Sequence, residues 1–133
     1  MGVYKINFTG DLEIEVRAVD FKDIFDTLVK SFCDMVSGDD SDLFFEKELE
    51  LDSDIPDVFV DFFNELIYLF ETEGFIPKLV SDFKKNEKTV IKLKGFKFDF
   101  YKDKPKRVLK AATYHDLKFA SDDSFYLKII VDL

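Results

Sequence analysis

Apolar and polar residues alternate near both ends of the chain, a pattern typical of strands that bury one face. The alternation covers residues 3–8, resumes over 11–17 after Thr9-Gly10, and returns over 125–133. We therefore expect two N-terminal strands joined by a short turn or bulge, and a core strand at the end of the sequence.

A helical spacing of three and four separates the apolar residues between Phe21 and Val36. Asp20 stands where a carboxylate can cap the first turn, and Gly38 stands where helices commonly end. The acidic residues that follow, Asp39 to Asp42, lack the glycine and glutamate of a calcium-binding loop. We interpret them as solvated turn residues.

A second and broader apolar stripe runs from Val58 to Phe70. We expect Asp54 to cap this helix, Pro56 to lie in its first turn and Gly74 to end it. The remaining pattern predicts strands, with a hairpin turn at 86–87, over residues 43–52, 79–85, 88–98, 96–103, 107–112 and 114–119.

This order of elements predicts an α+β fold, a mostly antiparallel sheet with two α-helices packed on one face. The 133 residues suffice for a single domain over 1–133. With 17 Phe and no Trp, the core is expected to be rich in phenylalanine.

Charge is unevenly distributed along this chain of net charge −9. Residues 1–83 hold 6 Lys/Arg against 21 Asp/Glu, whereas residues 84–118 hold 12 against 4. This distribution suits docking to a charged partner, and it equally suits a charge-rich solvated surface.

No apolar run is long enough to span a membrane, and the N-terminus does not have the pattern of a signal peptide. With Cys33 as the one cysteine, we expect a reducing cytoplasmic setting, and a monomer is the default expectation.

Catalytic motifs are missing from the sequence, and Cys33 falls on the apolar stripe of the first helix, so we expect it in the core. His115 shares a predicted strand side with Leu117 and Phe119, which favours a partly buried histidine over a catalytic base. An enzyme is therefore disfavoured.

Carboxylates offer the more interesting candidate site. Asp11 begins the second predicted strand and Asp132 lies near the end of the last one. If these strands are neighbours, both side chains converge with the carboxylate of Leu133. Oxygen donors without soft ligands suit a hard cation such as Ca²⁺ or Mg²⁺, although most acids at strand ends are simply solvated.

Several stretches resemble the archease family, over nearly the whole chain. FTGDLEI (8–14) resembles the family's HTADIGI, and NELIYLFETEG (64–74) is close to NELLFLFETEG. PKRVLKAATYHDLKF (105–119) resembles PKxEVKAxTYHxL, and the final VDL resembles the family's hydrophobic-Asp-hydrophobic ending. Phe8 and Glu13 depart from the pattern, because the family usually has histidine and glycine there.

The resemblance implies a non-enzymatic accessory of the GTP-dependent 3′-phosphate RNA ligase of tRNA splicing, which promotes ligase guanylylation and multiple turnover. It implies a sandwich related to strand-helix-strand-strand modules. It also implies a divalent cation, Ca²⁺ with Mg²⁺ or Mn²⁺ as alternatives, held by Asp11, Asp132 and Leu133. Nucleic acid would be engaged only indirectly, through the ligase.

A second hypothesis is a chaperone-like binding module for other tRNA-modifying proteins, such as a tRNA methyltransferase. Glu71 and Glu73 end the second helix without a basic residue to offset the helix dipole, which hints at a surface role. We take Glu71, Glu73 and His115 as candidate partner-binding residues. An enzyme with His115 as its base is the least favoured hypothesis.

Overall fold

The computed structural model describes residues 2–38, 42 and 45–133. Within these residues the chain forms two helices and seven strands. The helices are α1 (Phe21–Val36) and α2 (Asp57–Glu73). The strands are β1 (Val3–Phe8), β2 (Leu12–Ala18), β3 (Phe45–Leu51), β4 (Phe75–Lys85), β5 (Thr89–Lys97), β6 (Ala111–Ser121) and β7 (Phe125–Asp132).

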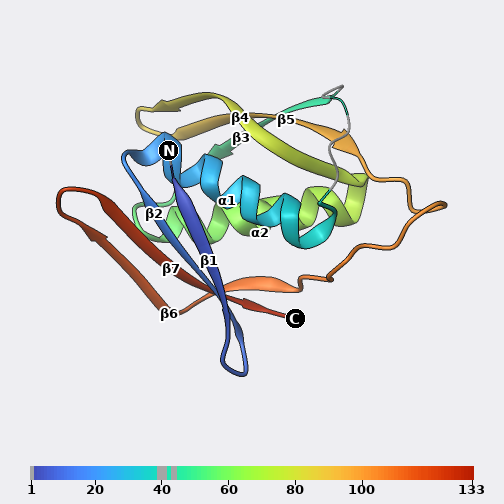
Figure 1. The fold of residues 1–133 in the computed structure, drawn as a ribbon. Coiled ribbons are helices and arrows are strands. Elements are labelled where there is room, and N and C mark those ends of the chain that lie inside the picture. Colours follow the sequence, from blue (N-terminus) through green and yellow to red (C-terminus); the bar gives the residue numbers. More distant parts are fainter. Residues whose placement is uncertain (1, 39–41, 43–44) are drawn as a thin grey trace.

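The strands form two antiparallel sheets, one in the order β1-β2-β7-β6 and the other in the order β3-β5-β4. Both helices lie between the sheets, so each sheet has helices on one face and an open outer face (Figure 1). Helix α1 contacts β4 and β2, and α2 contacts β6 and β4. The expected α+β class is confirmed, with the strands divided between two sheets.

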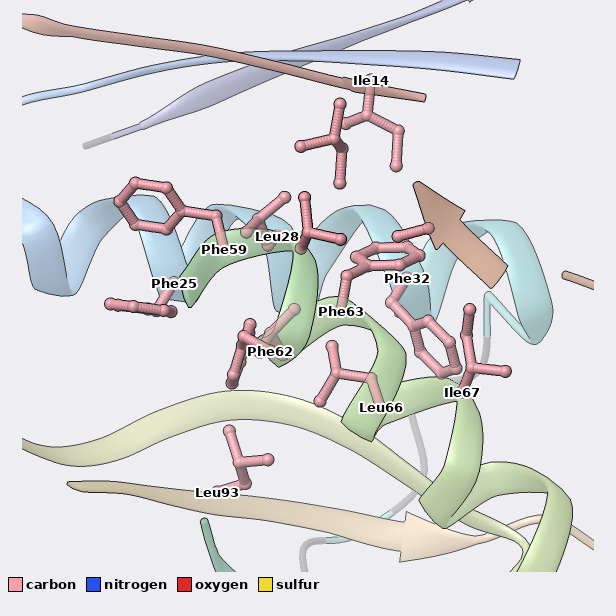
Figure 2. Packing of buried hydrophobic residues seen from close by; sticks show 14 of the residues in the cluster. Ile14, Phe25, Leu28, Phe32, Phe59, Phe62, Phe63, Leu66, Ile67 and Leu93 are labelled. Carbon is pink, nitrogen blue, oxygen red and sulfur yellow. The ribbon is translucent and has the colours of Figure 1, made fainter. Parts of the chain in front are cut away.

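The core is rich in phenylalanine, as the composition predicts. Phe25 packs against the rings of Phe59 and Phe62, and Phe32 packs edge-on against Phe63. In Figure 2, Ile14 of one sheet and Leu93 of the other lie on opposite sides of the helix side chains. A fully buried phenylalanine contributes about 1.5–3 kcal/mol through the hydrophobic effect, so these rings contribute substantially to the stability of the layered fold.

The first helix begins and ends as expected. The Asp20 carboxylate accepts a hydrogen bond from the Asp23 N–H at 2.8 Å. At the other end, Gly38 has a φ of 66° and its N–H donates to the Cys33 carbonyl. Cys33 is buried, also as expected.

The predicted cap of the second helix was wrong. Pro56 occupies the N-cap position and provides no side-chain hydrogen bond there, while Asp54 contributes only its carbonyl, which accepts from the Val58 N–H at 2.9 Å. Because the helix begins at Asp57, the Asp54 side chain lies too early in the chain to cap it. Gly74 ends the helix at a φ of 68°, as predicted.

Two predicted strands, over 96–103 and 107–112, are also wrong. β5 ends at Lys97, and residues 98–110 form a long connection without a regular element before β6. The apolar pattern there has another cause, because the rings of Phe98 and Phe100 pack on Phe70 at the end of α2.

The acidic run at 39–41 and the first two residues of the expected strand 43–52 lie outside the described residues, and the rest of that strand corresponds to β3. Among the described residues, no helix is both long and apolar enough to cross a membrane.

Candidate functional site

The ends of the central strands place the three predicted metal-binding residues together. Leu12 of β2 pairs with Val131 of β7, and Asp132 pairs with Ala111 of β6. Residues next to these pairs line a surface hollow of about 410 Å³: Gly10, Asp11, Lys110, Ala111, Asp132 and Leu133. The strand pairing assumed from the sequence is therefore present, and it brings Asp11, Asp132 and Leu133 to one hollow.

The local backbone explains how these residues are positioned. Gly10 has a φ of 97°, a conformation that L side chains rarely adopt, and it lets the chain turn between β1 and β2 directly before Asp11. The Lys110 N–H donates to the Asp132 carbonyl at 2.8 Å and so ties the start of β6 to the end of β7. The hollow thus rests on three neighbouring segments fixed by backbone hydrogen bonds.

The chemistry of this donor set suits a hard cation. Asp11 and Asp132 are exposed and each offers a carboxylate, and Leu133, which lines the same hollow, is 56% exposed. In the described part of the chain, no three His, Cys, Asp or Glu side chains form a ready cluster for a metal ion. The cation site predicted from the sequence therefore needs a further oxygen donor besides the two aspartates, and it stays a prediction.

Lys110 is a lining residue that the sequence did not indicate. It is the basic residue among the lining residues, which otherwise include the two aspartates. Its position before β6, opposite Asp132, follows only from the sheet pairing, and a single sequence does not reveal such pairing.

The two departures from the family pattern lie beside the hollow and outside its lining. Glu13 lies opposite Ile130 and its carboxylate is 3.9 Å from the Lys128 ammonium. The Phe8 ring lies under the guanidinium of Arg107, 4.6 Å from the ring centroid. The Glu13 carboxylate thus already has a lysine ammonium as its neighbour, and the Phe8 side chain has no atom that could bind a metal ion.

Glu73 at the end of α2 has partners that its own helix does not provide. Lys47 of β3 donates to its carboxylate, and Lys97 of β5 donates to its backbone carbonyl at 3.0 Å. The hydrogen bond from Lys47 is the main cause that lowers the pKa of Glu73. The unfavourable interaction with the helix dipole is therefore offset by lysines from the neighbouring sheet.

Glu71 is exposed and lies beside a small apolar hollow that Val108 and Leu109 also line. Neither Glu71 nor Glu73 reaches the carboxylate hollow. Their role in partner binding stays a prediction.

His115 is not partly buried, contrary to our expectation. Three quarters of its side chain is exposed (75%), and its Nε2 lies 3.3 Å from the Asp116 carboxylate. The register of β6 shifts between Thr113 and Lys118, and Asp116 has a φ of 52°. Inward and outward side chains therefore do not alternate regularly across this bulge. The prediction that His115 is partly buried, because it shares a strand side with Leu117 and Phe119, was wrong for that reason.

The sequence also did not reveal a polar junction between α2 and β6. Asn64 donates through Nδ2 to the Ala112 carbonyl at 3.0 Å and accepts from the Ala112 N–H at 2.7 Å. Asp61 accepts from the hydroxyls of Tyr114 and Ser53, and its hydrogen bond raises the pKa of Tyr114 to about 12. The only available signal was that Asn64 and Tyr114 fall in the two stretches that resemble the family.

Comparisons with known proteins agree with this architecture. The model of the Archease protein family matches residues 4–133. The chain is similar to Protein archease of Archaeoglobus fulgidus, at 29% identity over 95% of this chain and 94% of the relative. It is also similar to Protein archease of Pyrococcus furiosus, at 36% identity over 55% of this chain and only 58% of the relative's length.

Two solved structures share the fold. One is a Thermotoga maritima protein described as an archease and possible chaperone, with a TM-score of 0.68, 21% identity and coverage of 97% of this chain and 95% of that one. The other is the solution structure of Methanobacterium thermoautotrophicum protein 1598, with a TM-score of 0.70, 16% identity and coverage of 99% and 98%. Because the family model spans nearly all of the sequence, the chain belongs to the Archease protein family.

Proposed function

We propose that this protein is a non-enzymatic accessory of the cytoplasmic GTP-dependent 3′-phosphate RNA ligase, promoting its guanylylation and multiple turnover in tRNA splicing. The observation that carries the proposal is the hollow lined by Asp11, Asp132 and Leu133. Family membership supports it, because the resemblance implies a divalent cation at these three residues.

The residues of the hollow would each have a defined part. Asp11 directly precedes β2 and Asp132 ends β7, and the pairing of Leu12 with Val131 brings the two residues to the same end of the sheet. The Leu133 carboxylate completes an all-oxygen donor set for Ca²⁺, with Mg²⁺ or Mn²⁺ as alternatives. A divalent cation supplies positive charge that stabilises phosphate oxygens, which is what a guanylylation site requires.

The proposal is tested in two steps. Calorimetric titration with Ca²⁺ should show binding to the unmodified protein and its loss in Asp11→Ala and Asp132→Ala. Asp123→Ala is the matched control, because Asp123 is also exposed but lies in the turn between β6 and β7. Unchanged Ca²⁺ binding in the two hollow variants would contradict the cation site.

The second step measures guanylylation of the partner ligase, and repeated turnover, with the same variants. One further variant adds a single residue after Leu133, which displaces the carboxylate while leaving the core intact. Activation should fall in all three hollow variants and persist in Asp123→Ala. Full activation by the extended chain would exclude the Leu133 carboxylate, and full activation by both aspartate variants would exclude the site.

A second candidate function is a chaperone-like module for tRNA-modifying proteins such as a tRNA methyltransferase. It is supported by the description of the Thermotoga maritima neighbour as a possible chaperone. Co-purification with a tRNA methyltransferase at low and high salt tests this candidate. A contact that depends on the charge of Glu71 and of the residues around it should weaken strongly as salt rises. Absence of any co-purification at low salt would remove this candidate.

A further inference from the structure

Strand β1 is an edge of its sheet, and only β2 pairs with it. Edge strands present unpaired N–H and C=O groups, which natural proteins protect with charges, bulges or covering segments. β1 pairs with β2 in an unbroken register from Val3 to Phe8 and contains a single charged residue, Lys5. It is therefore a regular strand with little protection.

The other sheet edges in the described part of the chain are protected. β3 carries alternating charges, including Glu46 and Glu48, along its length. The pairing of β4 is interrupted at two places, and that of β6 is interrupted by the bulge that contains His115 and Asp116. The contrast identifies β1 as the edge suited to pairing with another strand.

Hollows of about 330 Å³ flank β1 on both of its faces. A strand added to this edge would direct successive side chains to opposite faces, so both hollows could receive them. The inner hollow is lined by Tyr4, Ile6, Phe8, Asp34, Met35, Lys106 and Arg107. The outer hollow is lined by Val3, Tyr4, Lys5, Glu15, Arg17 and Tyr126.

The carboxylates in these hollows are already engaged by neutral donors. Asp34 accepts from the Tyr4 hydroxyl. Glu15 accepts from Tyr126 at 2.6 Å and from Asn7 at 2.8 Å, and these two hydrogen bonds lower its pKa. Hydrogen bonds from neutral donors are thus the main interactions of the Glu15 carboxylate, and Lys5 and Lys128 add smaller electrostatic contributions.

The cations of the hollows lie beside rings or act on a carboxylate from a distance, and no ion-pair contact is seen for them among the described residues. Arg17 lies over the ring of Tyr126 and Arg107 over that of Phe8. Among the described residues, none of the four cations Lys5, Arg17, Lys106 and Arg107 forms an ion pair. The residues that line the two hollows thus include four cations against two carboxylates, in a chain whose net charge is −9.

We propose that the β1 edge binds an acidic, extended segment of a partner protein as an added strand, with its side chains alternating between the two hollows. Backbone hydrogen bonds would provide affinity, and the cations would select acidic residues. A second copy of this chain fits less well, because pairing β1 with itself would bring Lys5 and the neighbouring cations against their own equivalents. The inference does not depend on the carboxylate hollow or on a ligase.

The test uses a fluorescein-labelled peptide about six residues long with alternating Glu and Val. Fluorescence anisotropy should show binding that weakens as salt rises, and a Lys/Val peptide should not bind. Replacing both Lys106 and Arg107 by Gln should weaken binding by about two- to thirtyfold, the effect of two exposed ion pairs. Lys104→Gln is the control, because Lys104 is exposed in the same connection and lines neither hollow.

Amide hydrogen exchange on the unmodified protein separates strand addition from simple charge attraction. Bound Glu/Val peptide should slow exchange in β1 and leave β3, an edge strand of the second sheet, unchanged. A peptide of equal charge with proline at alternate positions should give no protection. Equal binding of the proline peptide, unchanged exchange in β1, preferential binding of oligouridylate, or self-association through β1 in sedimentation would each overturn the proposal.

Discussion

Replacing Asn64 by Ala tests the junction between α2 and β6. The Asn64 amide makes two hydrogen bonds to Ala112, at 2.7 and 3.0 Å, and Ala112 is only 5% exposed. The N–H and C=O of a strand residue point to the same side of the strand. Because both Ala112 groups bond to Asn64, they face away from β7, at the edge of β6 that pairs with no other described strand. Asn64 therefore takes the place of a strand partner.

The expected cost follows from this geometry. Two hydrogen bonds contribute about 0.5–1.5 kcal/mol each, and leaving buried partners unsatisfied adds to that loss. We expect Asn64→Ala to lower the free energy of unfolding by about 2–4 kcal/mol. In urea this corresponds to a midpoint lower by roughly 1–2 M, with an unchanged slope.

A matched control and a second variant isolate the effect. Asn86→Ala, in the exposed turn between β4 and β5, should change the free energy of unfolding by less than about 0.5 kcal/mol. Asn64→Asp keeps the acceptor, loses the donor and places a charge beside the Ala112 carbonyl, so it should also destabilise at neutral pH. If Asn64→Ala loses no more stability than Asn86→Ala, the amide does not bridge to Ala112 in solution.

Three further predictions concern the core and two titrating groups. Phe63→Ala removes a fully buried ring and should cost about 3–5 kcal/mol in urea unfolding, and a loss below about 1 kcal/mol would contradict the packing. Lysines lower the pKa of Glu73, so the stabilisation that its ionised side chain gives the fold is present above the ordinary glutamate pKa and is lost as pH falls through the lower folded value. The difference in unfolding free energy between the unmodified protein and Glu73→Gln should therefore shrink in acid. A difference that stays constant with pH would refute this linkage. Asp61→Asn should move the pKa of Tyr114 from about 12 toward 10 in an alkaline absorbance titration. In the unmodified protein, the stabilisation from the Tyr114–Asp61 hydrogen bond should be lost as pH rises through the raised pKa of Tyr114. An unchanged titration would exclude the hydrogen bond.

Much of the fold could be predicted from the sequence, because local patterns determine strands and helices. Alternation located β2 and β7, and the stripe from Phe21 to Val36 matched α1. The same reasoning failed at residues 98–110, where Phe98 and Phe100 are apolar because they pack on a helix and not because they belong to a sheet. The spacing of apolar residues indicates which side chains are buried. It does not indicate which helix or strand they pack against.

The candidate site was predictable only in part, for a related reason. Asp11 and Asp132 could be proposed as neighbours once β2 and β7 were assumed to pair. Lys110 could not, because nothing local places the start of β6 beside the end of β7. The exposure of His115 depends on one bulge, and a bulge reverses the strand side of every residue that follows it.

The position of β7 has a consequence for synthesis of the protein. β7 is the last of the described strands in chain order, yet it lies between β2 and β6 in its sheet. During translation, at about 5–20 residues per second, residues 19–124 must be made before β7 can pair with β2 of the β1–β2 hairpin. Pairing so distant in sequence folds slowly, so the edge of β2 that pairs with β7 stays uncovered for most of that time.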